Sequence, residues 1–408
     1  MKKKKLLYFF YNRFHDPLLQ SNIFLYINEL AKSGEYDVAI ITYEDKKFPL
    51  SAAEKRRTHE ALKAQSIAWH PLEWHAGSNL ILKGIDLLEG FTRLAYLVLV
   101  KDYRNVISLG SIAGSFLYLF SKTTKLKFYL YQYEPHSEYA LDNKIWSAGS
   151  PQYKLLHRFE ERAVKACTVV SSGTDNMRRR LEDWQIKAPF FKVSSVANDK
   201  LFRFNSSQRE RLRRELNIKP EHRLVIYPGK LGELYCSAQQ LIQVFKTLYQ
   251  RDTGFRFLVI TPNNAEINMA LQQASELREV LRLLPPAPYT EMPNYLSAAD
   301  LGIVAVLPGP SKQFISNIKV GEYLCAGLPY LICRGISEDD LIAEKHSVGV
   351  VVKDLTPGEA QDAYPKIKDL LSEPREALAE RCRNAGILYR GFENQYREFQ
   401  KAVTALTE

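Results

Sequence analysis

Short apolar runs alternate with amphipathic stretches along most of the chain. Residues 6–11 form an apolar run of strand length, residues 21–32 carry apolar side chains at helical spacing, and residues 36–42 form the next apolar run. This order predicts a parallel sheet, because strands that alternate with helices usually pair in parallel. We expect further strands in this half at residues 66–69, 106–109, 127–133, 167–171 and 191–193.

A polar stretch at residues 198–207 interrupts the alternation, which restarts at residues 223–227. The chain is therefore predicted to be an α/β protein with two doubly wound, Rossmann-like domains that face each other across a cleft. Ligands in such sheets bind at the carboxyl ends of the strands, so we expect the site in that cleft. We place the domains at residues 1–204 and 205–385, followed by a helical segment at residues 386–408.

The composition is that of a globular protein with an excess of positive charge. The 408 residues carry a formal net charge of +10, with a pI of about 9.1, which favours nucleic acids, acidic lipids or phosphorylated ligands as partners. The five cysteines show no CxxC spacing, so we expect neither a disulfide framework nor a zinc site, and a reducing cytoplasm fits. Residues 105–121 carry no charge but are short for a membrane span, and we expect a buried strand, a turn and a helix there.

Residues 308–329 offer a candidate anion site at the start of a helix. Ser316 is a suitable N-cap, and Gly327 is a common type of helix end. The start of such a helix presents unpaired N–H groups and the positive end of its dipole, which suit a phosphate. Lys319 and Glu322 share a face, so a cation could meet a diphosphate while a carboxylate accepts hydrogen bonds from a ribose diol. The alternative is an ordinary capped helix with a solvated Lys–Glu pair.

Two other stretches carry candidate chemistry. Residues 229–232, Gly-Lys-Leu-Gly, follow an expected strand, and glycines there let backbone N–H groups approach a diphosphate, although a tight strand–helix turn is the alternative. His136 lies between Glu134 and Glu138, where it could orient a sugar hydroxyl and where the carboxylates would raise its pKa. The alternative is a surface histidine in an acidic loop. We expect no metal at these three residues, because no second His or Cys cluster lies nearby in the sequence.

The remaining charge clusters are interpreted as structural. Basic segments at residues 178–180 and 209–214 lack the interleaved aromatic residues of a nucleic-acid platform, so we expect solvated helix faces and no nucleic-acid partner. The stretch at residues 337–340, Ser-Glu-Asp-Asp, is interpreted as a helix start, where the dipole favours negative charge.

Taken together, four motifs resemble a known family: KFYLYQYEPHSEY at residues 127–139, GKLG at 229–232, EMPNYLSAADLGIV at 291–304 and SNIKVGEYLCAGLP at 316–329. This set is similar to that of GT-B glycosyltransferases, close to family 4, and the likeness covers most of the chain. The resemblance implies transfer of a sugar, of the hexosyl type, from a nucleotide-sugar donor to an acceptor. It also implies retention of configuration, with no metal and no cofactor.

The resemblance assigns roles on the candidate helix. Glu322 would bind the nucleotide ribose, and Ser316, Asn317 and Lys319 would hold the diphosphate. The second domain would thus bind the nucleotide-sugar, the first would face the acceptor, and the C-terminal helix would cross back onto the first domain.

The resemblance also assigns residues outside that helix. Gly229, Lys230 and Gly232 would form the facing donor loop, and His136 would be the catalytic residue near the reacting sugar.

We expect a cytoplasmic enzyme of surface polysaccharide or glycolipid assembly that acts on a sugar or a lipid-linked sugar. Its positive charge suits peripheral contact with anionic lipid at the inner face of the plasma membrane. Phe314 and Cys236 stand where family 4 has a glutamate and a lysine, which motivates an alternative: an inactive GT-B module that binds a nucleotide-sugar or a partner enzyme. A nucleotide-sugar epimerase of the same fold is the third hypothesis.

Overall fold

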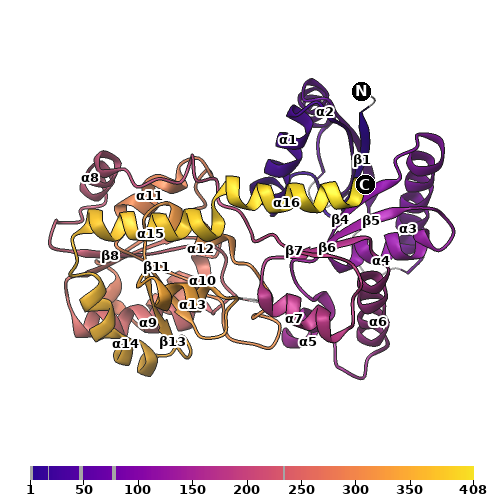
Figure 1. The fold of residues 1–408 in the computed structure, drawn as a ribbon. Coiled ribbons are helices and arrows are strands. Elements are labelled where there is room, and N and C mark those ends of the chain that lie inside the picture. Colours follow the sequence, from indigo (N-terminus) through magenta and orange to yellow (C-terminus); the bar gives the residue numbers. More distant parts are fainter. Residues whose placement is uncertain (1–2, 17, 46–48, 76–79, 233–234) are drawn as a thin grey trace. The chain divides into compact units, whose positions relative to one another are not determined.

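A computed structural model describes the chain except for residues 1–2, 17, 46–48, 76–79 and 233–234 (Figure 1). The chain divides into two compact units: Met1–Val193 together with Tyr396–Glu408 forms the first, and Ser194–Gln395 forms the second. The first unit is therefore assembled from both ends of the chain, whereas the second is one continuous segment. The sequence placed the corresponding boundaries after residues 204 and 385.

The first unit contains a seven-stranded parallel sheet with the order β3-β2-β1-β4-β5-β6-β7. Leu7 of β1 is level with Ala39 of β2 and with Val106 of β4, so the strand order reverses at β1, as in a doubly wound sheet. Leu7 and its neighbours are buried because helices cover both faces of a parallel sheet. The strands are β1 (Lys4–Phe9), β2 (Tyr36–Asp45), β3 (Ile67–Trp74), β4 (Asn105–Leu109), β5 (Lys127–Tyr131), β6 (Val169–Ser172) and β7 (Phe190–Lys192).

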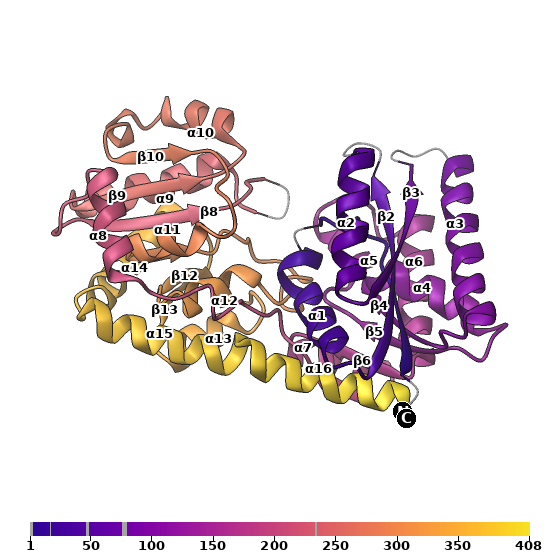
Figure 2. The same ribbon diagram turned by 90° about the horizontal axis from the view of Figure 1, so that it is seen from above.

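Helices cover both faces of this sheet (Figures 1 and 2). Right-handed crossovers place α1 and α2 on one face and α3, α4 and α6 on the other. The last helix, α16, packs onto α1 through Phe399, whose ring lies 4.7 Å from that of Tyr26, which is why the end of the chain belongs to this unit. The helical elements are η1 (Leu19–Ile23), α1 (Phe24–Lys32), α2 (Ala52–Ala64), α3 (Leu80–Ala95), η2 (Tyr96–Val100), α4 (Gly110–Ser121), α5 (His136–Asp142), α6 (Pro151–Ala166), α7 (Asp175–Asp183) and α16 (Phe392–Thr407).

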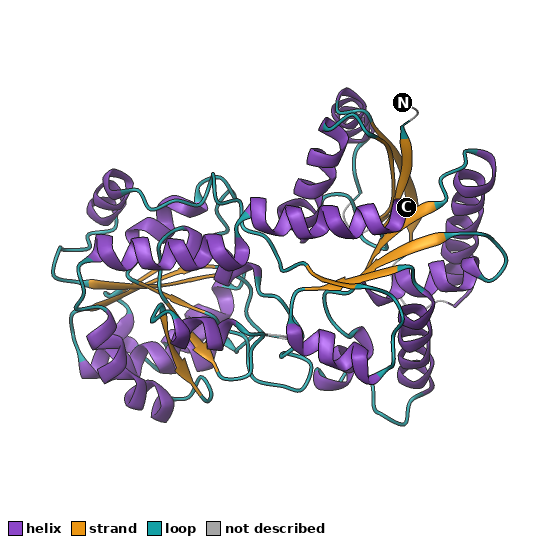
Figure 3. Ribbon diagram, viewed as in Figure 1, coloured by secondary structure: helices purple, strands orange, loops and turns teal. Residues whose placement is uncertain are grey.

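The second unit contains a six-stranded parallel sheet with the order β10-β9-β8-β11-β12-β13, which reverses at β8 (Figure 3). Its strands are β8 (Arg223–Pro228), β9 (Phe255–Ile260), β10 (Leu281–Leu284), β11 (Leu301–Ile303), β12 (Tyr330–Cys333) and β13 (Gly349–Val352). Its helices are α8 (Ser206–Glu215), α9 (Ala238–Arg251), α10 (Asn264–Leu271), η3 (Ser275–Leu277), α11 (Met292–Ala298), α12 (Ile318–Cys325), α13 (Asp339–Lys345), α14 (Pro357–Leu370) and α15 (Arg375–Arg390). The prediction of two doubly wound α/β halves is confirmed.

Individual elements match the sequence to different degrees. Residues 105–121 form the predicted buried strand and helix, β4 and α4, and Gly110 makes the turn with φ of +76°. Within the described residues, no helix combines the length and apolarity needed to cross a bilayer. β3 runs past its predicted end and includes Pro71, which is tolerated because β3 lies at the edge of the sheet. The short edge strand β10 was not predicted, because its four residues are too few to show the alternation of apolar and polar side chains that identifies a strand.

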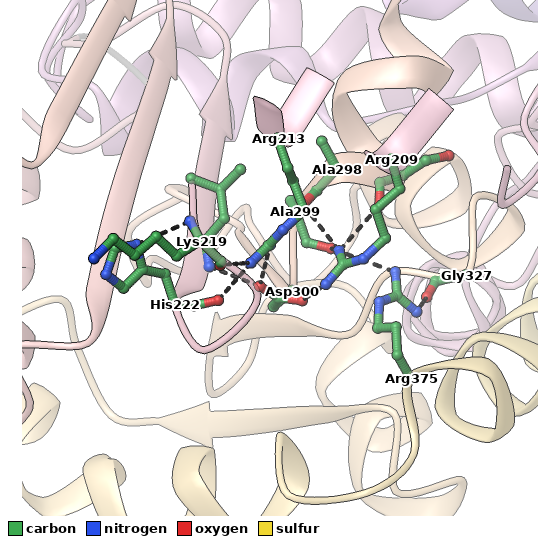
Figure 4. Close-up of polar contacts among 11 residues, drawn as sticks. Arg209, Arg213, Lys219, His222, Ala298, Ala299, Asp300, Gly327 and Arg375 are labelled. Atoms are coloured by element: carbon green, nitrogen blue, oxygen red, sulfur yellow. Dashed lines mark hydrogen bonds and ion pairs between the residues drawn. The ribbon is translucent and has the colours of Figure 1, made fainter. Parts of the chain in front are cut away.

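An arginine–aspartate cluster fixes the start of β11 in the second unit (Figure 4). Asp300 directly precedes β11, accepts a hydrogen bond of 2.7 Å from the Leu224 N–H of β8, and pairs with Arg209 at 2.6 Å and Arg213 at 3.0 Å. Burial lowers the pKa of Arg213, and Asp300 opposes that effect. The prediction of a solvated basic face at residues 209–214 is therefore wrong for Arg209 and Arg213, which turn inward to a carboxylate distant in sequence.

Arg209 has a second structural role at the end of α11. Its Nη1 donates to the last carbonyls of that helix, which have no partner within the helix itself. The acceptors are the carbonyl oxygens of Ser297, Ala298 and Ala299, at 3.2, 2.9 and 3.0 Å. The cluster thus joins α8, α11 and β8 to the start of β11.

We predict that Asp300→Ala destabilises the protein by about 3–5 kcal/mol, because it leaves two largely buried guanidinium groups facing each other without a counter-charge. Urea unfolding measures the change. The control is Glu215→Ala on α8, the helix that carries the two arginines. It removes the exposed partner of Arg211 and should cost less than about 1 kcal/mol. Equal losses for the two variants would contradict the structural role given to Asp300.

Candidate functional site

Helix α12 has its N-cap one residue later than expected. Asn317 is the N-cap, and its Oδ1 accepts a hydrogen bond of 3.0 Å from the Lys319 N–H. The prediction that Ser316 caps this helix is therefore wrong. Among the described residues, the N–H groups of Ile318 and Val320 have no hydrogen-bond acceptor, so the first turn of α12 retains donors for a ligand.

Ser316 is instead held from within the second unit. Its hydroxyl accepts a hydrogen bond of 2.9 Å from the Ser195 N–H and another from the guanidinium of Arg390. Arg390 also pairs with Asp339, and both side chains are almost completely buried. Burial raises the pKa of Asp339, and the charge of Arg390 opposes that effect. These contacts fix the backbone that leads into α12.

Arg390 and Asp339 are positioning residues that sequence reasoning missed. The predicted helix start is confirmed, since α13 begins at Asp339, but the Asp339 carboxylate pairs with a guanidinium from α15 and does not cap α13. Arg390 also packs against α12, where a Cβ at Gly321 would lie 3.1 Å from the Arg390 Cβ. No local signal links these positions, because Ser195, Asp339 and Arg390 are far apart in the sequence.

Lys319, Glu322 and the first glycine of the 229–232 turn come together. A Cβ at Gly229 would lie 2.8 Å from Lys319 Cε, so the end of the Lys319 side chain lies against the backbone of this turn. The Lys319 ammonium lies 4.8 Å from the centre of the Tyr235 ring, a cation–π distance. The structure therefore places the Gly229 turn directly beside the cation of α12.

Glu322 lies one turn along α12 and is only partly exposed. Burial raises the pKa of Glu322 to about 7, while the charge of Lys319 and a hydrogen bond with the Tyr289 hydroxyl act in the opposite direction. The carboxylate is therefore neither a freely solvated group nor sealed in the core. Tyr289, from the loop before α11, was not among the predicted residues.

Both glycine N–H groups of the 229–232 turn donate hydrogen bonds to other backbone carbonyls of the protein. The Gly229 N–H donates to Ile260 O at 2.9 Å, and the Gly232 N–H donates to Cys236 O at 3.0 Å. Gly232 is needed for its φ of +78° rather than for space, because nothing lies within 4 Å of a Cβ there. The exposed side chain of Lys230, and not the glycine amides, is the group that this turn offers to a ligand.

Phe314 and Cys236 are both buried. Burial raises the pKa of the Cys236 thiol to about 12, so it carries no charge near neutral pH. Neither residue supplies the carboxylate or the ammonium that stands at these positions in family 4.

His136 belongs to the first unit, where it begins α5 just beyond β5. Its Nδ1 lies 3.8 Å from Glu134 Oε1. Burial lowers the pKa of His136, but Glu134 and the charge of Glu160 outweigh burial, and the pKa lies above its ordinary value. The prediction that neighbouring carboxylates raise the pKa of His136 is confirmed for Glu134. Glu138 does not contribute, because it pairs with Arg180 of α7, and Glu160 of α6 is the second carboxylate that raises the pKa.

The described residues contain no group of three or more His, Cys, Asp or Glu side chains arranged to hold a metal ion.

No protein-family model matches the chain, and no curated protein matches its sequence. Several solved structures share its fold. A glycosyltransferase from Rickettsia africae superposes with a TM-score of 0.71 at 12% identity, covering 100% of both chains. HepE of Anabaena, solved in complex with UDP, has a TM-score of 0.69 at 12% identity and covers 98% of this chain and 99% of its own. A candidate UDP-N-acetylglucosamine 2-epimerase from Listeria monocytogenes has a TM-score of 0.63 at 12% identity, covering 99% and 96%.

These likenesses span both units and establish a GT-B fold. The predicted resemblance to GT-B glycosyltransferases is thus confirmed at the level of the fold.

We predict that Glu322→Gln flattens the pH dependence of stability. The pKa of Glu322 in the folded protein, about 7, lies above its ordinary value of 4.5, so the unfolded state binds fewer protons between these values. The free energy of unfolding should therefore fall as pH rises from about 4.5 through about 7, by about 3 kcal/mol at most. Urea unfolding across this range should show the fall in wild type and not in the variant. Glu380→Gln, at an exposed position of α15, should behave like wild type.

Proposed function

We propose that this protein is a glycosyltransferase that moves a sugar from a nucleotide-sugar donor to an acceptor. The observation that carries the proposal is the convergence of Gly229, Lys319 and Glu322 at the start of α12, in a fold shared with glycosyltransferases. Solved complexes of HepE contain UDP and UDP-glucose, which supports a uridine nucleotide-sugar as the first donor to test.

The donor diphosphate would lie against the first turn of α12. The N–H groups of Ile318 and Val320 and the ammonium of Lys319 would face its charge, since helix starts and cations both favour anions. Asn317 would hold this turn in place through its cap, and Ser316 would act through its anchoring to Arg390.

The Glu322 carboxylate would accept hydrogen bonds from the two ribose hydroxyls, a role that requires the ionised form. Lys230, together with the turn between Gly229 and Gly232, would approach the donor from β8. His136 would orient the reacting sugar from the first unit. We propose that the reaction needs neither metal nor cofactor and retains the configuration of the transferred hexose.

The acceptor is proposed to be a sugar or a lipid-linked sugar, as in surface polysaccharide or glycolipid assembly in the cytoplasm. A structure with a TM-score of 0.65 at 14% identity, covering 98% of this chain and 99% of its own, is WaaG, a glycosyltransferase involved in lipopolysaccharide biosynthesis.

A nucleotide-sugar epimerase is the second candidate, favoured by the likeness to the Listeria protein. NMR of the donor alone separates the two, because an epimerase converts the sugar ring without an acceptor and a transferase does not. An inactive binding module, suggested by the buried Phe314 and Cys236, would bind donor and release no nucleotide in the presence of any acceptor.

We predict that Lys319→Ala and Glu322→Ala each weaken binding of UDP-glucose at least about tenfold, because each removes a charge-assisted hydrogen bond. Isothermal titration calorimetry measures the dissociation constants. The exposed Lys353→Ala serves as a matched loss of charge in the same unit and should bind as wild type does. Unchanged affinity in Glu322→Ala would remove that residue from the ribose role.

We also predict that UDP-glucose affinity rises with pH across the pKa of Glu322. In the protein without ligand the Glu322 carboxyl has a pKa of about 7, so below that pH a proton competes with the ribose for the carboxylate. The affinity should therefore increase about tenfold between pH 6 and pH 8. The diphosphate of UDP-glucose does not titrate in this range. Glu322→Gln should bind weakly at every pH and lose the dependence, and a dependence that persists in the variant would assign it to another group.

A further inference from the structure

The outward side of α3 and η2 is largely apolar. Ile85, Leu88, Tyr96, Leu99 and Val100 are between 41% and 68% exposed and lie on one side of the helix, together with the exposed polar residues Glu89 and Thr92. The opposite side of the helix packs inward through Asp86, Gly90, Leu94 and Leu97, which are buried. We call Ile85, Leu88, Tyr96, Leu99 and Val100 the apolar stripe. Single exposed leucines are common on soluble proteins, but several large apolar side chains exposed on one side of a helix mark an interaction surface.

A helix on the other face of the same sheet shows what a solvated surface looks like in this unit. α2 buries Leu62 and exposes a run of charged side chains that begins with Glu54, Lys55, Arg56 and Arg57. The two helices flank one sheet, so the apolar character of the α3 surface is specific to that face (Figure 2).

Two neighbouring helices extend the surface. α4 packs against α3 through the rings of Phe91 and Phe116, 5.2 Å apart, and against α6 through Tyr118 and Phe159, 6.2 Å apart. α3, α4 and α6 therefore lie side by side (Figure 1). Toward solvent, α4 adds Leu119 and Lys122, and α6 adds Lys154, Leu155, Arg158, Arg162 and Lys165.

Positive charge dominates the edges of the stripe. Lys101 follows η2 directly, and its ammonium lies 5.6 Å from the centre of the Tyr96 ring. Lys122 lies 4.9 Å from the Tyr118 ring. Glu89 is exposed among the residues of the stripe, and Glu161 on α6 is paired with Lys165 at 2.6 Å. Tyrosine rings with adjacent lysines are typical of the headgroup level of a membrane.

We propose that the outer face of α3, α4 and α6 is a docking surface for an anionic lipid bilayer. The apolar stripe enters the boundary between headgroups and acyl chains, and the cations of α6, with Lys101 and Lys122, face lipid phosphates. This occupant fits better than a second copy of the chain. A two-fold contact presents the same patch on both partners, and it would bring the like-charged faces of α6 into one interface.

The proposal does not depend on sugar transfer. If the proposed function also holds, the surface would bring the first unit, which carries His136, to a lipid-linked acceptor. Vesicle binding tests the surface and UDP-glucose binding tests the function, so the failure of one is distinguishable from the failure of the other.

The experiment is flotation of the full chain with two kinds of vesicle, phosphatidylcholine alone and phosphatidylcholine with phosphatidylglycerol. We expect binding to the anionic vesicles, weakened by added salt because salt screens the attraction. Leu88→Ser combined with Leu99→Ser should lower the apparent affinity about tenfold or more. Arg158→Glu combined with Arg162→Glu should lower it similarly and reduce its salt dependence.

Both double variants change exposed side chains, so the fold should persist, and UDP-glucose binding in the second unit should stay as in wild type. Met269→Ser on α10, 68% exposed like Leu88, is the matched control and should float like wild type. Three results would overturn the proposal: no binding of wild type to anionic vesicles, equal binding by the leucine double variant, or a dimer in light scattering that this variant dissociates.

Discussion

The ion pair between Arg390 and Asp339 is the constraint on which the candidate site depends. Both charges are buried, and a buried charge is tolerated only when its partner and its hydrogen bonds are in place. The same guanidinium holds the Ser316 hydroxyl, and the Arg390 carbonyl accepts the Ala197 N–H at 2.9 Å. One residue at the end of α15 thus connects the start of the second unit, through its carbonyl, to the loop that opens α12, through its side chain. The orientation of the α12 amides follows from that connection.

The sequence predicts the framework because apolar runs and helical spacing are local properties. The alternation of strands and helices identified both doubly wound halves, and the spacing of Lys319 and Glu322 placed them on one face of α12. The choice of cap could not be predicted, since Ser316 and Asn317 are both suitable residue types. It was decided by Ser195, which is 121 positions from Ser316, and by Arg390.

The same limit applies to the charges around His136. The sequence predicted that the pKa of His136 is raised by its neighbours Glu134 and Glu138, but α7 supplies Arg180 to Glu138, and the second carboxylate that raises the pKa is Glu160 of α6. The net charge of +10 also gave only a coarse indication of which surfaces could bind anionic partners. Arg209 and Arg213 are engaged with Asp300 and with helix carbonyls, so the charge that faces partners is set by placement rather than by the total.

The first unit is discontinuous in sequence. Its sheet is complete by β7, but the helix that covers Tyr26 comes from the last residues of the chain. During synthesis the amino-terminal sheet must therefore wait, with this apolar patch uncovered, until the whole second unit has left the ribosome. The final helix completes the packing of the first unit. A premature stop codon within this helix would therefore impair the amino-terminal sheet, which is synthesised first, rather than the second unit, which is synthesised later.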